Sequence, residues 1–295
     1  MRFTGWVILL TGFLSHAQWL VPADTLDVKR QRTVMVTGAA GYGLAVVALN
    51  QLWYSDHERS NFKLKNDNAE WLQMDKAGHG YAGYHLSRLG SEALAWSGSS
   101  QKTQVIAGTA SALGFLTAIE IMDGHSARWG FSWGDMGANV AGAGLFAGQE
   151  LLWDEQRIIP KFSFHTTVYA SERPEALGAS VPEQLFKDYN GQTYWLSANL
   201  HAFGVRKAPR WLNVAFGYGA EGMITANDDL VNTVFLPDKA RFRQYYISLD
   251  ADLTKIRTKS GVLRTLFSIF NTVKIPAPTL EINEKGIVKF YPVYF

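Results

Sequence analysis

The sequence predicts an α+β protein, in which an N-terminal bundle of about four small-residue-rich helices is followed by a β-rich C-terminal region packed on it. Two observations favour this fold class. Long, nearly uncharged segments with Ala and Gly at four-residue spacing fill the first half of the chain, and period-two alternation begins near residue 161. With 295 residues, 47% of them hydrophobic, the chain can bury a large core.

The first residues, 1–17, are expected to form a secretory signal peptide. An apolar run follows Arg2 and ends at Leu14, and a small-residue cleavage motif, SHA, comes next. This run is shorter than the roughly 20 residues that a membrane-spanning helix needs. The sequence contains no cysteine, so it has no disulfide framework. We therefore expect an exported protein, in the periplasm or at the outer membrane of a Gram-negative cell envelope.

Capping residues and apolar periodicity predict the helices of a bundle over residues 18–160. Asp67 is expected to cap the second helix, which Ser97-Gly98 would end, and Ser132 is expected to cap the fourth. Small residues four apart predict close approach of the helices, and the pairs are Gly108 with Ala112, Ala138 with Gly142, and Gly144 with Gly148. The expected helices cover residues 33–53, 67–96, 104–122 and 132–153.

The motif VTGAAGYG in the first helix resembles the glycine-rich turn of dinucleotide-binding enzymes only superficially. Its glycines, Gly38, Gly41 and Gly43, miss the required spacing, and no alternation of strands and helices follows. No nicotinamide cofactor is therefore expected, and close helix packing is the favoured use of these glycines. A net charge of +2 without a basic run also excludes nucleic acid as a partner.

The second region, residues 161–295, is expected to form about six strands. Asn190-Gly191 predicts a hairpin turn. The chain ends in Phe295 after alternating Val and Tyr, as the last strand of an outer-membrane barrel does, but six strands fall short of the eight that such a barrel needs. A sheet packed on the bundle is favoured. The expected strands lie within 161–170, 193–203, 211–222, 241–253, 279–286 and 287–295, with a helix at 262–273.

Three successive helices each carry a pair of polar residues at helical spacing. Residues three or four apart lie on the same side of a helix, so each pair would point in one direction. Because unpaired buried charge is costly, a shared polar centre with counter-charges is the economical arrangement. The pairs are Asp75 with His79, Glu120 with Asp123, and Asp135 with Asn139.

This polar centre allows a chemical and a structural interpretation. Asp and His at this spacing can converge on one proton or one metal ion. Alternatively, Asp75 pairs with Lys76 or Arg88, and Asp135 satisfies amides at the start of its helix. The candidate catalytic residues are Asp75, His79, Glu120 and Asp135, and the candidate substrate-binding residues are Lys76, Arg128 and Asn139. The candidate ligands of a divalent metal ion, the cofactor that these residues would suit, are Asp75, His79, Glu120 and Asp123.

The spaced pattern DK-x-x-H, then Glu, then Arg, then S-x-x-D-x-x-x-N-x-x-G resembles the VanZ-like and YfiM-like envelope proteins. The VanZ-like part covers residues 67–153. A longer pattern, which includes NDNAEWLQMDKAGH, RWGFSWGDMGAN and KDYNGQTYWLS and covers most of the mature protein, resembles predicted periplasmic lipoproteins of unknown function. Asp123 stands where VanZ-like sequences usually have Gln, and the lipoprotein cysteine is missing. The residues that carry the pattern are Asp75, Lys76, His79, Glu120, Arg128, Ser132, Asp135, Asn139 and Gly142.

Two functions follow from these features. The first is a structural or accessory component of the envelope, in which the polar centre locks the bundle. The second is an enzyme or binder acting on an amphiphilic envelope substrate, such as a lipid-linked phosphate or a peptidoglycan precursor. Partners are expected to be membranes or envelope proteins. Three of the helices are long enough to cross a bilayer, but the charges of the second would keep it from facing lipid.

Overall fold

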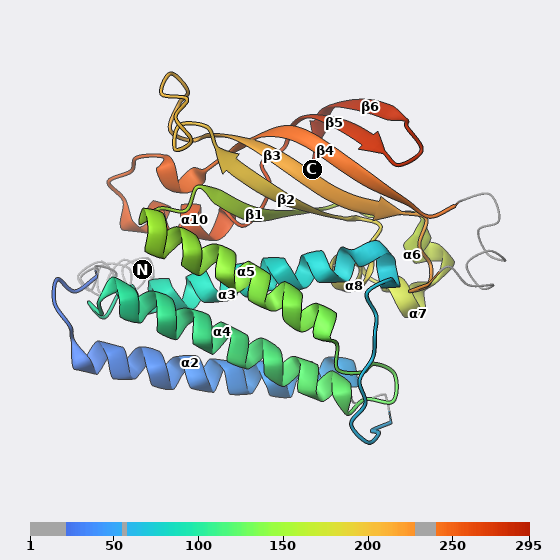
Figure 1. Ribbon diagram of the computed structural model, residues 1–295, viewed down its shortest axis with the longest axis horizontal. Helices are drawn as coiled ribbons and strands as arrows, with labels where there is room; N and C mark the ends of the chain where they lie inside the picture. The colour runs from blue at the N-terminus through green and yellow to red at the C-terminus, as the bar shows by residue number, and fades with distance from the viewer. Residues whose placement is uncertain (1–21, 55–57, 228–239) are drawn as a thin grey trace, which may run out of the picture.

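The computed structural model describes residues 22–54, 58–227 and 240–295. The signal peptide expected at residues 1–17 lies outside this part of the chain. Helices form the first half of the molecule and a six-stranded antiparallel sheet forms most of the second, which confirms the predicted α+β class. Figure 1 shows the sheet on one side of the bundle and α2 on the side farthest from it.

The bundle consists of four long helices that begin with side-chain caps in three cases. Asp27, Ser100 and Ser132 each accept hydrogen bonds from the first turn of α2, α4 and α5, as short polar side chains do at helix starts. A π-helical turn, η2 (Asn50–Tyr54), extends α2. The four helices are α2 (Val28–Leu49), α3 (Met74–Ala95), α4 (Gln101–Gly124) and α5 (Trp133–Trp153).

The predicted start of the second helix at Asp67 is wrong. A 3-10 turn, η3 (Glu70–Gln73), precedes α3, and its residues from Trp71 to Gln73 have positive φ angles. Trp71 donates its backbone N–H to Ala226, and Leu72 accepts a hydrogen bond from the Tyr218 hydroxyl, so contacts with the β-rich half hold this turn outside the helix. The predicted end is confirmed, because Gly98 takes the positive φ that stops the chain from continuing as a helix.

Helix α3 is the centre of the bundle and packs closely on α4 and α5. A Cβ atom at Gly83 would overlap the carbonyl oxygen of Asn139, and one at Gly142 would overlap that of Gly80. These glycines therefore set the short distance between α3 and α5. The prediction of close packing is wrong for Gly144 and Gly148 and for the three glycines of α2, because a Cβ atom at any of them would meet nothing within 4 Å.

The β-rich half is a single sheet with strand order β1-β2-β3-β4-β5-β6, in which every neighbouring pair is antiparallel. The strand expected over residues 161–170 is shorter than predicted, since α6 (Tyr169–Glu172) occupies its end, and Asn190-Gly191 joins α8 (Val181–Lys187) to β2 instead of joining two strands. The remaining short helices are α7 (Pro174–Leu177), η4 (Leu253–Lys255) and α10 (Gly261–Phe270). The strands are β1 (Ile158–Phe164), β2 (Gln192–Asn199), β3 (Leu212–Glu221), β4 (Phe242–Ala251), β5 (Ala277–Asn283) and β6 (Val288–Tyr294).

One face of this sheet buries polar side chains, whereas the other carries apolar ones. Lys161 and Asp250 form a fully buried ion pair of 2.8 Å on the first face, beside the buried Trp195. Alternation along each strand places apolar residues such as Leu196 and Phe216 on the second face. The second face meets the bundle through aromatic contacts of Tyr81 on α3 with Phe162 and Tyr194.

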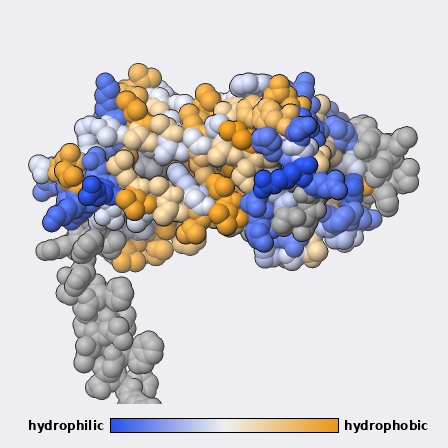
Figure 2. Space-filling view, turned by 90° about the horizontal axis from the view of Figure 1, so that it is seen from below, coloured by the Kyte–Doolittle hydropathy of each residue, from blue (hydrophilic) through white to orange (hydrophobic). Residues whose placement is uncertain are grey.

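Within the described ranges, two helices are long and apolar enough to cross a membrane by length and composition, α2 and α4. No residue of α2 is buried, and its exposed side chains include Met35, Val36, Leu44 and Val47. Figure 2 views the molecule from the α2 side and shows hydrophobic residues across the middle of this face, with hydrophilic residues gathered toward both ends.

Candidate functional site

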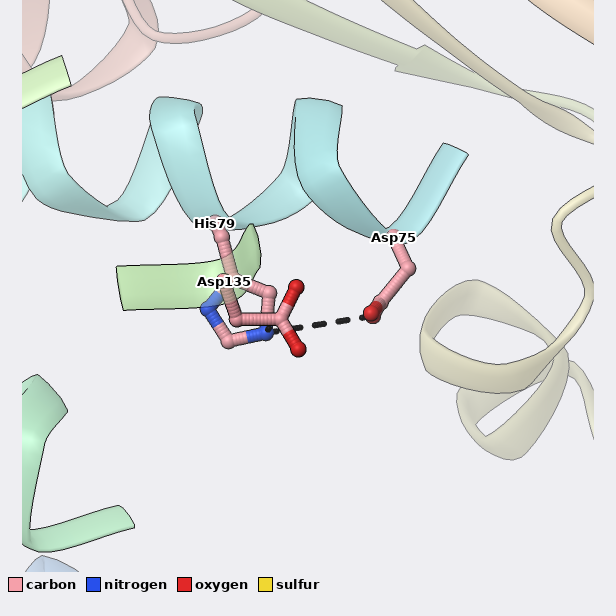
Figure 3. A group of neighbouring side chains, drawn as sticks. All are labelled: Asp75, His79 and Asp135. Atoms are coloured by element: carbon pink, nitrogen blue, oxygen red, sulfur yellow. Dashed lines mark ion pairs between the residues drawn. The ribbon is translucent and has the colours of Figure 1, made fainter. Parts of the chain in front are cut away.

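The start of α3 and the start of α5 bring the central polar residues together. Asp75 and His79 are one turn apart on α3, and Asp135 lies in the first turn of α5, where Ser132 caps the helix. Figure 3 shows the side chains of Asp75, His79 and Asp135 pointing toward one another. The close approach of α3 and α5 at their glycines makes this meeting possible.

Lys76 holds two carboxylates of this group. Its Nζ lies 2.6 Å from Asp67 Oδ1 and 2.7 Å from Asp135 Oδ1. Burial disfavours the charged form of Lys76, but the bonds to Asp135 and Asp67 outweigh burial and raise its pKa. The Ser132 hydroxyl also donates to Asp67 Oδ1, at 2.6 Å, so Asp67 ties the loop before α3 to both helices.

His79 lies between three carboxylates. Its Nε2 is 3.9 Å from Asp75 Oδ1 and 3.8 Å from Asp135 Oδ1, and its Nδ1 is 3.7 Å from Glu120 Oε1. Nδ1 also lies 3.1 Å from Asn139 Oδ1, which accepts a hydrogen bond when this nitrogen carries the proton. Burial alone would lower the pKa of His79, but the charges of Asp75, Asp135 and Glu120 raise it.

Glu120 is the more deeply buried of two buried acids in the group, with an exposed fraction of 1% against 5% for Asp135. Its Oε2 accepts the backbone N–H of Ser132 at 3.2 Å, whereas its Oε1 has no hydrogen-bond partner in the part of the chain that the structure describes. Burial raises the pKa of Glu120 to about 7, against the charge of His79, and burial together with the charge of Asp75 raises the pKa of Asp135 to about 7.

Two predicted site residues have other contacts. Asp123 accepts a hydrogen bond of 2.8 Å from Tyr54, and burial raises its pKa to about 6. Arg128 is exposed, with its guanidinium over the ring of Trp129. The structure thus brings together Asp75, Lys76, His79, Glu120, Asp135 and Asn139, but places Asp123 against Tyr54 and Arg128 at the surface. The catalytic and binding roles of all these residues stay predictions.

Two members of the site were missed by the sequence analysis. The pattern around Asp67 predicts a helix cap and does not indicate its ion pair with Lys76, nine residues farther along the chain. Tyr189, from the turn after α8, donates its hydroxyl to Asp75 Oδ1 at 2.7 Å. It lies more than a hundred residues farther along the chain, and no local pattern marks it.

A pocket of about 470 Å³ opens beside this group, between the bundle and the β-rich half. Asp75 and His79 form part of its wall, so the polar group is open on this side. Its apolar and aromatic wall includes Leu116, Ile119, Phe162, Leu185, Phe186 and Tyr194.

A second pocket of about 480 Å³ lies on the other side of Tyr81 and Tyr194, which line both spaces. Its wall is mainly apolar and combines small residues of α3 and α5 with the apolar face of the sheet. Both volumes fall in the range of small-molecule sites. The pair of pockets therefore offers one polar wall and a long apolar surface.

In the part of the chain that the structure describes, one group of three side chains could hold a metal ion. Asp75, His79 and Asp135 each offer one ligand atom, and these atoms all lie within 4.8 Å of one another. Two of the predicted metal ligands, Asp75 and His79, belong to this set. The third member is Asp135, and the predicted ligands Glu120 and Asp123 are not part of it.

The comparisons with known proteins give a family match over the bundle. Residues 64–148 match the model of a family described as predicted periplasmic lipoprotein (DUF2279). No curated protein and no solved structure matches the chain. The matched segment contains the whole of the polar group except Tyr189, and the description agrees with export. Over residues 64–148, this chain is similar to predicted periplasmic lipoproteins.

Proposed function

We propose that this protein is an envelope protein that binds an amphiphilic molecule between its bundle and its sheet. The observation that carries the proposal is the composition of the pocket beside α3. Asp75 and His79 provide a hydrogen-bonding end, while residues such as Leu116 and Phe162 provide an apolar wall. Small-molecule sites typically combine a few directed polar groups with a mostly apolar lining.

The second pocket supports an elongated ligand. Tyr81 and Tyr194 stand between the two spaces, and only their side chains belong to both walls. A head group at Asp75 and His79 would leave an apolar chain free to follow the aromatic wall toward α5 and β3. Burial of such a chain stabilises binding by about 25 cal/mol per Å² of apolar surface removed from water.

The proposed location is the periplasm or the outer membrane of a Gram-negative envelope, with α2 against lipid. The similarity to periplasmic lipoproteins supports export. The 22 residues of α2 span about 33 Å at 1.5 Å per residue, close to the thickness of a hydrocarbon core. Its exposed apolar surface is the support for a membrane partner.

A pocket-filling substitution tests ligand binding without altering the polar group. Ile119 lines the pocket, and Ile106 is an exposed isoleucine of the same helix. We expect Ile119→Trp to abolish binding of a fluorescent lysophosphatidylcholine and to lower the amount of lipid that co-purifies, measured by native mass spectrometry. Ile106→Trp is the matched control and is expected to bind as the unmodified chain does. Equal binding by both variants, or no binding by the unmodified chain, would contradict the proposal.

A structural or accessory role is the second candidate, and the contacts of Lys76 favour it. Lys76 joins Asp67 and Asp135 and so ties a loop, α3 and α5 together. If this is the sole role, envelope proteins should co-purify from gently solubilised membranes, and the pocket-filling variant should keep them. A chain isolated without partners, together with normal envelope integrity after deletion, would contradict this second role.

A further inference from the structure

We propose that Asp75, His79 and Asp135 bind one divalent transition-metal ion whose open side faces the pocket beside α3. The ion would use Nε2 of His79 and one oxygen of each carboxylate. This inference goes beyond the proposed ligand binding, because the metal site can exist whether or not an amphiphile binds.

The distances between the three ligand groups suit a small metal ion. Bonds of about 2.0–2.2 Å at tetrahedral angles place neighbouring ligand atoms about 3.4 Å apart. Nε2 of His79 lies 3.9 Å from Asp75 Oδ1 and 3.8 Å from Asp135 Oδ1. All three ligand atoms lie within 4.8 Å of one another, so side-chain movements of about an ångström or less would bring them to bonding positions.

The tautomer of His79 is set by its other nitrogen. Nδ1 lies 3.1 Å from Asn139 Oδ1, and donating its proton there leaves the lone pair on Nε2, the nitrogen that faces the two carboxylates. Metal-binding histidines commonly donate their second N–H to an oxygen in this way. Asn139 would thus orient the ligand, and it comes from the same helix as Asp135.

An independent observation concerns the buried groups behind His79. Glu120 Oε1 and Asn139 Nδ2 are buried and have no hydrogen-bond partner among the described residues, although Glu120 and Asn139 are 1% and 0% exposed. Glu120 Oε1 points at His79 from 3.7 Å. The Oε1 atom of Glu120 therefore faces the imidazole without a hydrogen bond, and an ion bound at Nε2 would place positive charge on the ring that this oxygen faces.

Lys76 competes with the ion for Asp135. Its Nζ is 2.7 Å from Asp135 Oδ1 and 3.4 Å from Asp75 Oδ2, so the ammonium group neutralises the carboxylates that the ion would use. Asp67, at 2.6 Å, would hold Lys76 when the metal takes Asp135. Removing this ammonium group should therefore strengthen metal binding.

The ligand set favours ions such as Zn²⁺ and Mn²⁺ over Ca²⁺. One imidazole nitrogen with two carboxylate oxygens suits these transition metals, whereas Ca²⁺ takes about six to eight oxygen ligands. Asp75 and His79 also line the pocket, which leaves room for water or a ligand oxygen at a further coordination position.

Metal binding can be measured directly on the purified full-length chain. After treatment with a chelator, we expect the chain to take up one Zn²⁺ or Mn²⁺ in calorimetry and in elemental analysis by mass spectrometry. Asp75→Asn and His79→Ala should lower the affinity for the ion by about tenfold or more. Circular dichroism of each variant checks that it is folded.

Three further variants separate this site from the alternatives. Asp123→Asn alters the acid that is bonded to Tyr54 and should leave metal binding unchanged, whereas Lys76→Met should strengthen it. Ile119→Trp should block the amphiphile but keep the metal, so the two proposals can fail separately. The absence of stoichiometric binding to the unmodified chain, or equal binding by folded Asp75→Asn and His79→Ala variants, would overturn the metal site.

Discussion

The bundle and the sheet both bury charged side chains, but these side chains differ in how fully they are hydrogen-bonded and shielded from solvent. In the sheet, Lys161 bonds Asp250 Oδ2 and the carbonyl oxygen of Ala251, and Ser197 and Ile275 donate to the two oxygens of Asp250. Neither side chain of the ion pair has any exposed surface. This pair is closed, and each of its charged atoms has a hydrogen-bond partner.

The polar group of the bundle is neither closed nor complete. Asp75 and His79 keep 26% and 20% of their side-chain surface and line a pocket. Glu120 Oε1 lacks a partner in the described part of the chain. A stabilising network is expected to resemble the sheet pair, so the difference favours a binding role for the bundle group.

The largest expected loss of stability comes from replacing the lysine of the sheet pair, and replacing the lysine of the bundle group provides the comparison. Lys161→Met leaves Asp250 charged and buried, which should lower the free energy of unfolding by about 3–5 kcal/mol. Lys76→Met should cost less, about 1–2 kcal/mol, because the neighbouring Asp135, with its pKa raised to about 7, can take up a proton. Chemical denaturation of both variants measures the difference. A larger loss of stability for Lys76→Met than for Lys161→Met would indicate that the bundle group, and not the sheet pair, is the stabilising one.

The next largest change in stability is expected where α3 and α5 approach each other at their glycines. Gly142→Ala would push a Cβ atom into the carbonyl oxygen of Gly80, and it should lower the free energy of unfolding by at least about 2 kcal/mol. Gly144→Ala on the same helix meets nothing within 4 Å and should stabilise the protein by about 0.5–1 kcal/mol. Thermal unfolding of the two variants provides the measurement. Similar changes in melting temperature for both would rule out the close contact between the two helices.

The buried acid Glu120 in the bundle group should make the free energy of unfolding depend on pH. Burial raises the pKa of Glu120 from 4.5 to about 7, so on raising the pH the unfolded chain releases this proton before the folded one. The stability from Glu120 is complete below pH 4.5 and is lost as the pH rises through about 7. His79, whose pKa is also raised, adds a loss in the same direction.

Glu120→Gln should remove part of this loss, on the order of 2 kcal/mol between pH 5 and about 8, when unfolding is measured with a chelator present. The amide can still accept the backbone N–H of Ser132, so the local structure is preserved. An identical pH profile for the variant and the unmodified chain would show that Glu120 does not titrate in this range.

The smallest expected change in stability concerns the outer face of α2. Leu44 and Val47 are 71% and 66% exposed, so replacing both with Asp should change the free energy of unfolding by less than about 1 kcal/mol. Binding to phospholipid vesicles should nevertheless be lost in a flotation assay. Phe290→Asp, on an exposed residue of the sheet, is the control and should keep vesicle binding. Loss of binding in the control alone would move the membrane contact to the sheet.

The fold class and much of the site could be predicted because their signals are local. The cap at Ser132 and the spacing of Asp75 and His79 each depend on one helical turn, and both are found in the structure. The contact of Tyr189 with Asp75 depends on how the β-rich half packs on α3, which no spacing along the chain records. The same packing explains why the helix did not start at Asp67.

The faces of the sheet could not be assigned from the sequence for a related reason. Alternation showed two different faces, but the usual expectation places the apolar one inside. Here the polar face is buried around Lys161 and Asp250, and apolar residues such as Phe216 remain exposed where the bundle does not cover them. Tyr246, Tyr294 and Lys274 pack around Trp195 and cover the polar face from within the β-rich half, and no spacing along the chain records these contacts.

The contrast between an open and a closed polar group can be tested with two isosteric substitutions measured side by side. For Asp75→Asn, we expect affinity for the fluorescent lysophosphatidylcholine to fall by about tenfold while the free energy of unfolding changes by less than about 1.5 kcal/mol. For Asp250→Asn, we expect a loss of about 3 kcal/mol or more in the free energy of unfolding, with affinity unchanged while the protein is folded. Unchanged binding by Asp75→Asn together with a stability loss as large as that of Asp250→Asn would show that the bundle group is structural.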